Sequence, residues 1–348
     1  MARGTGSPID PDKLIADFKQ YDRSVDVVSA YHWLFTDTKE LPATVSHFER
    51  YPKIQHSDGN AATPDFTVLF KDGTGIAAEI ANLALHDNSV EKLCKQLERY
   101  AALHCLPDAT GGFTPVDVLD VIFLSPMETA DAAVQRVLRD RLDSPEHWFK
   151  PKRRPVLIEF AANPDRYVFR FWPEKSVNGT LHMGDRNPNY ADFKESLKIP
   201  PVHFGPNKIR YGFMNDPVPP LYMATRLWMN VFPSEFGTGA TEFTATALKI
   251  AGLLRAQYQH GTADDVRAAM GVLVAAGLAA QTARNTWSVT RRSLRRDDHD
   301  VHVAIAERVG SLGKRLQTAS RPRRNKTQVD GQGTLFDQAP ETTGPTST

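Results

Sequence analysis

The chain has 348 residues, of which 41% are hydrophobic, and its formal net charge at neutral pH is +1. This length predicts about two folded domains plus tails. No apolar run approaches the roughly 18 residues of a membrane-spanning helix, and no signal peptide is recognisable, so we expect a cytoplasmic protein with no membrane partner. The cysteines, Cys94 and Cys105, are too few for a disulfide framework or a structural zinc site.

The first part of the chain is expected to form one α/β domain over residues 11–174, after a disordered stretch over residues 1–10 that is rich in Gly, Ser and Arg. Apolar residues at helical spacing predict helices over 11–21, 25–35 and 43–50.

Two apolar runs, at residues 66–70 and 76–80, flank an Asp-Gly pair at positions 72 and 73. This pair predicts a tight β-hairpin turn, because glycine readily takes the positive φ that such a turn requires. Asp65 precedes the first strand and Glu79 lies near the end of the second, so the hairpin would bring the two carboxylates together. Paired carboxylates suit Mg²⁺ or Mn²⁺, and such a cation stabilises charge on a reacting phosphate.

The next segment, 88–104, has apolar residues at helical spacing. Its side chains Lys92, Gln96 and Tyr100 recur every four residues and therefore share one stripe of the predicted helix.

The pattern after this helix completes the expected α/β domain. A continuous apolar run over 116–124 predicts a buried strand near the centre of a mixed sheet. A helix over 130–142 and two strands, over 155–160 and 167–172, follow. Strands that alternate with helices predict a sheet with helices on its faces.

The Pro-Asp pair at Asp65, the turn and the apolar strand that ends at Glu79 resemble the core of the PD-(D/E)xK nuclease superfamily. Gln96 and Tyr100 match a Gln-x-x-x-Tyr element that follows the catalytic strand in many members. The resemblance implies a mixed sheet flanked by helices and metal-dependent DNA cleavage. Asp65 and Glu79 would be the metal ligands and, with Gln96 and Tyr100, would form the catalytic site.

The chain departs from the superfamily at position 81, where the family's lysine is replaced by Ala81. Lys92, one turn before Gln96, is the candidate replacement, with Lys95 as the alternative. Members also use a glutamate from a helix before the hairpin, which implies Glu49 as a third metal ligand, with Glu40 as the alternative. If no lysine substitutes, the fold would be a catalytically inactive adaptor.

The second half of the chain predicts a DNA-binding module. Residues 175–238, rich in Pro, Asn and Gly, are expected to form an irregular connecting lobe. Helices are predicted over 241–259 and from the N-cap Thr262 onward, followed by two short strands. This order is similar to a winged helix over 239–292, which implies contact with double-stranded DNA. Winged helices also bind proteins, so that alternative stays open.

Basic residues cluster after the predicted winged helix. Between Arg284 and Lys326 the chain has 12 Lys and Arg against 4 Asp and Glu. A basic segment on a neutral body favours a polyanionic partner, and residues 293–319 are expected to form a basic helical segment. The candidate DNA contacts are Arg267, Arg284, Arg291, Arg292, Arg295 and Arg296.

The tail, residues 320–348, has few large apolar residues and is expected to be disordered. Within it, residues 332–336 resemble the Gln-x-x-Leu-Phe peptide that binds the bacterial sliding clamp. Gln332, Leu335 and Phe336 would be the contact residues for the clamp. The alternative is that the peptide docks on the protein's own core.

Three hypotheses follow. The protein is a metal-dependent DNA endonuclease, an inactive nuclease-fold adaptor that binds DNA, or a factor recruited to the replication clamp. The domain order is similar to the nuclease subunit of heteromeric cut-and-paste transposases and to some restriction or phage-defence nucleases, and a repair role fits equally well. Such a protein would be associated with the nucleoid. The sequence indicates no oligomeric state.

Overall fold

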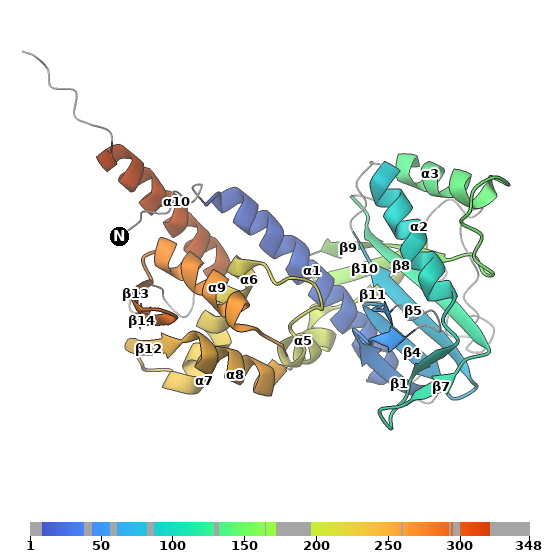
Figure 1. Cartoon of the computed structure of the whole chain (residues 1–348), viewed down its shortest axis with the longest axis horizontal. Helices are drawn as coiled ribbons and strands as arrows, with labels where there is room; N and C mark the ends of the chain where they lie inside the picture. Colours follow the sequence, from blue (N-terminus) through green and yellow to red (C-terminus); the bar gives the residue numbers. More distant parts are fainter. Residues whose placement is uncertain are drawn as a thin grey trace, which may run out of the picture.

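The computed structural model describes residues 9–37, 44–55, 61–81, 87–128, 132–163, 165–171, 196–258, 260–291, 294 and 300–320. Within these ranges, the long helix α1 (Pro11–Thr36) runs through two lobes (Figure 1). Its N-cap is Asp10, whose carboxylate accepts a hydrogen bond from the Asp12 amide. The two helices predicted over 11–35 are therefore one, because residues 22–24 contain no helix breaker.

The first lobe contains a seven-stranded mixed sheet with the order β1-β4-β5-β8-β9-β10-β11. Adjacent strands are antiparallel except for the pairs β5–β8 and β8–β9, which are parallel because helices connect them. The predicted α/β class is confirmed. The strands are β1 (Val45–Arg50), β4 (Phe66–Phe70), β5 (Thr74–Ile80), β8 (Val118–Pro126), β9 (Val156–Asn163), β10 (Arg166–Phe171) and β11 (Leu197–Ile199).

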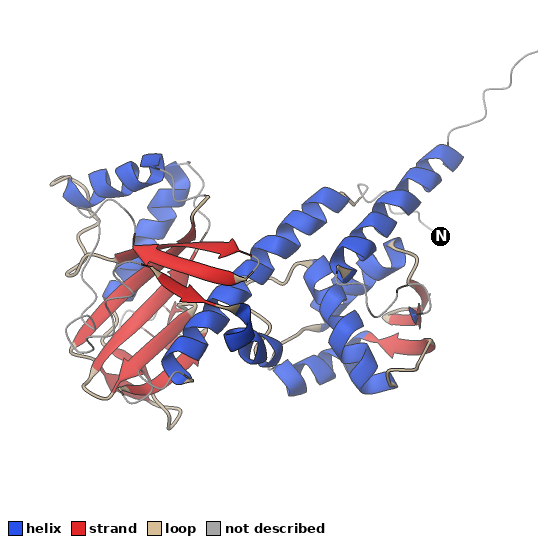
Figure 2. Cartoon of the chain, turned by 180° about the vertical axis from the view of Figure 1, so that it is seen from behind, coloured by secondary structure: helices blue, strands red, loops and turns tan. Residues whose placement is uncertain are grey.

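Helices cover both faces of this sheet (Figures 1 and 2). The second half of α1 and helix α5 (Pro201–Arg210) pack on one face, where Phe66 and Val68 of β4 are buried. Helices α2 (Asp87–Ala101) and α3 (Ala132–Asp143) cover the other face. Burial on both faces explains why the central strands read as continuous apolar runs. Two small ladders flank the sheet: β2 (Ile54–Gln55) with β3 (Ala61–Ala62), and β6 (Cys105–Pro107) with β7 (Phe113–Pro115).

The second lobe has its own core, to which α1 contributes Leu14, Phe18 and Tyr21. A three-stranded sheet in the order β12-β14-β13 lies beside its helices. The elements are α6 (Pro220–Arg226), η3 (Leu227–Val231), α7 (Phe232–Phe236), β12 (Glu242–Thr246), α8 (Ala247–Tyr258), α9 (Ala263–Ala275), β13 (Ala279–Ala283), β14 (Thr286–Thr290) and α10 (Val301–Ser320). No helix among the described residues has the length and apolar character needed to cross a lipid bilayer.

Three predicted segments differ in the structure. Residues 45–50 form strand β1 and not a helix, because they pair with β4, with one irregularity between Val45 and His47. The helix predicted over 241–259 begins only at Ala247, since the five residues before it pair with β14 as β12. The segment 175–238 is not wholly irregular: β11 is an edge strand of the main sheet, and helices follow it.

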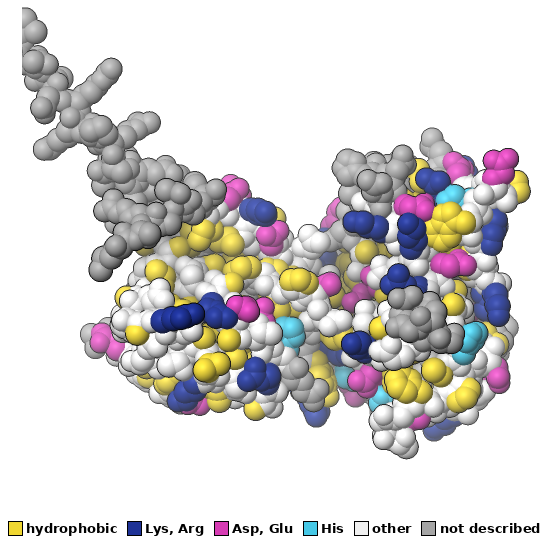
Figure 3. Space-filling model, in the orientation of Figure 1, with side chains coloured by type: hydrophobic (Ala, Val, Ile, Leu, Met, Phe, Trp, Pro, Cys, Tyr) yellow, Lys and Arg dark blue, Asp and Glu magenta, His cyan; other side chains and the backbone are white. Residues whose placement is uncertain are grey.

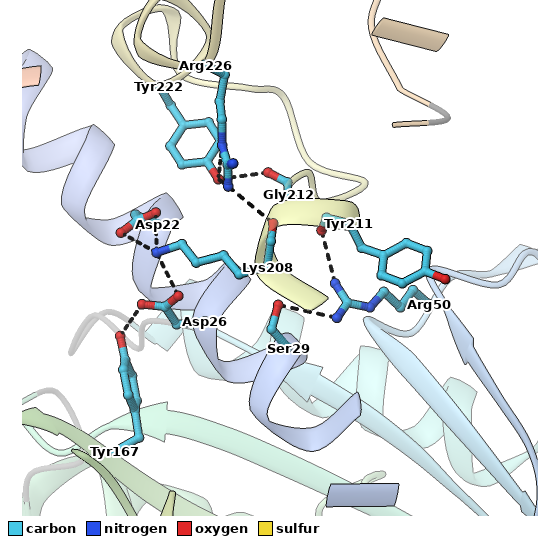
Figure 4. A network of polar contacts seen from close by, with 10 residues as sticks. All are labelled: Asp22, Asp26, Ser29, Arg50, Tyr167, Lys208, Tyr211, Gly212, Tyr222 and Arg226. Carbon is cyan, nitrogen blue, oxygen red and sulfur yellow. Dashed lines mark hydrogen bonds and ion pairs between the residues drawn. The ribbon is translucent and has the colours of Figure 1, made fainter. Parts of the chain in front are cut away.

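A polar network joins the lobes where α1 passes between them (Figure 4). The Nζ of Lys208, on α5, lies 2.8 Å from Asp22 Oδ1 and 2.7 Å from Asp26 Oδ1, both on α1. The hydroxyl of Tyr167, on β10, donates to Asp26 Oδ2 at 2.7 Å. From the second lobe, Arg226 at the end of α6 donates a hydrogen bond to the carbonyl oxygen of Lys208 at 3.3 Å. The network therefore ties the main sheet to the second lobe.

Replacing Gly212 by alanine is expected to destabilise this junction. A Cβ at this position would lie 2.6 Å from Arg226 Nη2 and 3.0 Å from the Lys208 carbonyl oxygen. Relieving that overlap should cost about 1–3 kcal/mol of unfolding free energy, measured by chemical denaturation. Gly252→Ala, inside α8 with no atom within 4 Å of the added Cβ, should instead stabilise the protein by about 0.5–1 kcal/mol. Equal effects of the two substitutions would contradict the steric argument.

Candidate functional site

Asp65 and Glu79 lie opposite each other at the ends of β4 and β5. The strands pair Phe66 with Ala78, and the Asp65 amide donates to the Ala78 carbonyl oxygen at 2.9 Å, so Asp65 lies beside the end of β5 that carries Glu79. Cross-strand partners project from the same face of a sheet. The hairpin prediction is confirmed, and both carboxylates lie on the face that α2 covers. Asp65 is held by the Ile80 amide, which donates to its Oδ2 at 2.7 Å.

Helix α2 holds Glu79 in place. The Tyr100 hydroxyl lies 2.8 Å from Glu79 Oε2 and 3.2 Å from the Thr63 carbonyl oxygen, two acceptors for its single proton. Gln96 Nε2 donates to the Tyr100 hydroxyl at 2.9 Å. Gln96, Tyr100 and Glu79 thus form a chain of hydrogen bonds from the helix to the acid pair. Of the predicted stripe Lys92, Gln96 and Tyr100 on α2, the last two residues therefore connect to the acid pair.

Asp65 is buried and Glu79 is half-buried, and this burial changes the proton affinity of both. Burial raises the pKa of Glu79 to about 7, although the hydrogen bond from Tyr100 opposes the change. Burial also raises the pKa of Asp65, and the negative charge of Glu79 raises it further. Among the described contacts, no lysine or arginine forms an ion pair with either acid. A bound cation would offset both the desolvation and the mutual repulsion of these carboxylates.

The other predicted members of the site lie farther out. Glu49 projects from β1 opposite Thr67, on the same face of the sheet as the acids, but its Oε2 pairs with His47 Nε2 at 2.9 Å. Lys92 and Lys95 are exposed on α2, and none of the described contacts joins them to either acid. Within the described ranges, no group of three or more His, Cys, Asp or Glu side chains is close enough to hold a metal ion. Among the described residues, the pair thus has no third direct ligand.

Two residues that act on the acids were not predicted. Tyr51 follows β1, and its amide donates to the Asp65 carbonyl oxygen at 3.0 Å. Asp216 lies in the connection between α5 and α6, and its charge raises the pKa of both Asp65 and Glu79. Neither residue belongs to a motif. The only sequence signal was an Asn-Asp-Pro turn at Asp216, which is common in surface loops.

The predicted DNA contacts of the second lobe fall into different environments. Arg284 is exposed at the turn between β13 and β14. Arg267, on α9, pairs with Asp264, and the half-buried Arg291 packs 5.8 Å from the centre of the Trp228 ring. Lys and Arg are spread over both lobes in Figure 3 and form no single patch on that face. The other predicted contact residues lie outside the described residues: Arg292, Arg295, Arg296, Gln332, Leu335 and Phe336.

A cation site at the acid pair would have an affinity for Mn²⁺ that rises with pH through about 7. Protons and the metal ion compete for Glu79, whose pKa is raised to about 7 by burial. Below that pKa, the affinity should fall by up to about tenfold for each pH unit. Electron paramagnetic resonance of free Mn²⁺ measures this. An Mn²⁺ affinity that does not change with pH below about 7 would contradict a metal site at Glu79.

Comparisons with protein-family models, curated proteins and solved structures found no match.

Proposed function

We propose that the protein is a metal-dependent nuclease that hydrolyses DNA phosphodiesters at the Asp65–Glu79 pair. The observation that carries this proposal is a buried and a half-buried carboxylate, held side by side, with no basic partner among the described contacts. Such a pair disfavours its own ionisation, and raised pKa values of this kind cluster at functional sites. Stability alone would favour neutral side chains here.

The order of elements around the pair supports the same proposal. A helix, α1, precedes three antiparallel strands, β1, β4 and β5, and α2 then leads to the parallel strand β8. The PD-(D/E)xK core has this order, with its acids on the second and third strands. The Gln96–Tyr100 pair occupies the helix that follows the catalytic strand, as the resemblance implies. A divergent member of that superfamily therefore accounts for the first lobe.

The residues at the pair fit a hard divalent cation. Asp65 and Glu79 would hold Mg²⁺ or Mn²⁺ through carboxylate oxygens. When bound, the ion would stabilise negative charge on the phosphate and make its bound water more acidic. Tyr100 and Gln96 would keep the Glu79 carboxylate oriented. Lys92 would supply the positive charge that Ala81 lacks, because a long side chain on the exposed end of the same stripe can swing toward the acids.

The second lobe would hold duplex DNA. Its order β12–α8–α9–β13–β14 is that of a winged helix, in which the hairpin lies against the DNA backbone. Arg284 is at the tip of that hairpin. The exposed side chains of α9 include Ala268 and Val274, which offer no hydrogen bonds to base edges. We therefore propose that this lobe, through Arg284, Arg267 and the arginines after β14, contacts mainly phosphates and contributes little base readout.

Cleavage of supercoiled plasmid with Mg²⁺ or Mn²⁺ tests the proposal. The wild type should nick or linearise DNA, and Asp65→Asn should reduce the rate by about 10³-fold or more, since the metal site would be lost. Lys92→Met should also slow cleavage. Lys95→Met, which removes another exposed lysine of α2, should have little effect. Equal rates for the wild type and Asp65→Asn would show that a contaminating nuclease cuts the plasmid.

The second candidate function is that of a DNA-binding adaptor on an inactive nuclease fold. Ala81 and the exposure of Lys92 favour it. This candidate predicts DNA binding that weakens with salt, without cleavage and without Mn²⁺ binding. The sliding-clamp peptide belongs to the same proposal. Its deletion, residues 332–336, should abolish retention of the protein on immobilised clamp, and unchanged retention would remove that partner.

A further inference from the structure

We infer that Arg170, held in place by Glu159, binds the DNA backbone phosphate next to the one that is cleaved at the acid pair. The inference rests on the nuclease function proposed above and adds a contact between that site and its substrate. Arg170 is far from the acid pair in sequence and belongs to none of the predicted motifs. Strand register places it in a row of polar side chains that crosses the sheet beside the acids.

The polar row spans three neighbouring strands, β8, β9 and β10. Ser125 at the end of β8 is paired with Glu159 on β9, and Glu159 is paired with Arg170 on β10. Paired residues on adjacent strands project from the same face of a sheet. Phe123 and Leu157, two residues before Ser125 and Glu159, are buried in the core under α2 and α3. The row therefore lies on the same face as the acid pair.

The row continues onto the strand that carries Glu79. Ile80 of β5 is paired with Leu124 of β8, and the Ala81 amide extends this ladder by donating to the Leu124 carbonyl oxygen at 3.1 Å. Ala81 thus stands beside Ser125. Because Ala81 follows Glu79 by two residues, both project from one face. The polar row begins next to the position where the superfamily's lysine is missing.

Strand spacing decides which phosphate Arg170 can reach. Adjacent strands are about 4.8 Å apart, so Glu159, two strands from Ala81, lies about 10 Å from it. The Nε of Arg170 donates to Glu159 Oε1, which turns the guanidinium toward β9. This is too far from Ala81 for a direct replacement of the lysine at the cleaved phosphate. A DNA strand that runs along the row carries a phosphate at every nucleotide, so a neighbouring phosphate meets Arg170.

Arg170 is oriented and still has hydrogen-bond donors available. Its side chain is 45% exposed, whereas that of Glu159 is 3% exposed, so the buried carboxylate holds a guanidinium that faces solvent. Nη2 contacts only the Met127 sulfur at 3.8 Å, which is a weak acceptor, and Nη1 has no partner among the described contacts. Two such nitrogens can donate parallel hydrogen bonds to a phosphate.

The hydroxyl of Ser125 independently indicates that a polar ligand belongs in this row. Its Oγ is fully buried and has no hydrogen-bond partner among the described residues. A buried hydroxyl without a partner is rare and costly. Ser125 lies one strand from Glu159, so a water molecule between the sheet and a phosphate on Arg170 would satisfy it.

The test measures how full-length variants bind a DNA duplex, by fluorescence anisotropy in Ca²⁺, a cation that carboxylates also bind. Arg170→Lys keeps a cation beside Glu159 but loses the planar fork. Arg170→Met combined with Glu159→Gln removes both charges. Neither variant leaves a buried carboxylate unpaired, so both should fold. The double variant should raise the Kd by about tenfold, and Arg170→Lys should also raise it. The Mn²⁺-dependent cleavage rate at saturating DNA should fall much less.

Arg166→Met is the matched control. Arg166 lies on the same strand, is 46% exposed and pairs with the neighbouring Asp165, so its loss should leave the Kd unchanged. A similar rise in Kd for Arg166→Met would show a non-specific charge effect and refute the contact.

The remaining outcomes separate this inference from the nuclease proposal. If the wild type cleaves DNA and both Arg170 variants bind it with the wild-type Kd, the role of Arg170 is refuted while the nuclease proposal stands. If the variants lose affinity but the wild type does not cleave, the phosphate contact stands and the nuclease proposal fails. A wild type that does not bind the duplex would refute both.

Discussion

Glu79→Gln is expected to make the metal-free protein more stable above pH 7 while abolishing Mn²⁺-dependent cleavage. Glutamine has nearly the same shape as glutamate, and its carbonyl oxygen can still accept the hydrogen bond from Tyr100. The substitution removes only the charge. The protein would thus lose a destabilising interaction and its metal ligand in one step, which is the usual relation between stability and activity at a functional site.

The expected gain depends on pH in a defined direction. The pKa of Glu79 is raised to about 7 in the folded protein by burial, so between its unfolded pKa and about 7 the native state holds a proton that the unfolded state has released. Stability of the wild type therefore falls as pH rises through this interval. The total loss is on the order of 2 kcal/mol once partial solvation of the pair is considered. Glu79→Gln should lack this loss, and denaturation at pH 5 and pH 8 measures the difference.

Glu159 provides the matched control. Its carboxylate is also buried, but it is paired with Arg170 from the adjacent strand β10. Glu159→Gln removes the partner of that arginine and should destabilise the protein by about 1–3 kcal/mol. The same substitution at Glu79 and at Glu159 should therefore change the unfolding free energy in opposite directions. Destabilisation by Glu79→Gln at pH 8 would show that the acid pair serves the fold and not a cation.

The sequence predicted the acid pair because its geometry is local. A three-residue turn over residues 71–73 sets the hairpin register, and the register brings Asp65 beside the end of β5 that carries Glu79. The Gln96–Tyr100 stripe was predictable for a similar reason, since helical spacing determines which side chains share a face. Neither statement requires knowledge of residues distant in sequence.

The errors come from interactions that are distant in sequence. Residues 45–50 have apolar side chains at Val45 and Phe48, a spacing that also fits a helix, and only pairing with β4 selects a strand. The same applies to β12, which continues without a break into the Ala-rich helix α8. Tyr51 meets Asp65 only because β1 pairs with β4, and Asp216 lies in the connection between α5 and α6, so no local pattern could indicate either residue.

Lys208→Met is expected to weaken the junction between the lobes by about 3 kcal/mol. Lys208 neutralises Asp22 and Asp26, and Asp26 is largely buried (Figure 4). Removing the ammonium leaves two carboxylates without a cation on adjacent turns of α1, and breaking a buried pair in this way typically costs about 3–5 kcal/mol. The lower end applies because the lysine side chain is 24% exposed.

The destabilisation should increase with pH. Burial raises the pKa of Asp26 in the wild type, and loss of the lysine charge should raise it further. At low pH the carboxyl is neutral and the variant loses little. As pH rises, the unfolded chain releases the proton first, so the native state is disfavoured progressively. Denaturation of Lys208→Met at pH 5 and pH 8 measures this, and a constant penalty would contradict an electrostatic origin.

Two further variants separate the buried charge from loss of the side chain itself. Asp26→Asn combined with Lys208→Met removes both charges, while the asparagine oxygen can still accept the hydrogen bond from Tyr167. It should therefore be more stable than Lys208→Met alone at pH 8. Lys249→Met breaks the exposed pair with Glu235 and should change stability by less than about 1 kcal/mol. Because α1 carries Asp26 and enters both cores, weakening this network should also loosen the connection that holds Asp216.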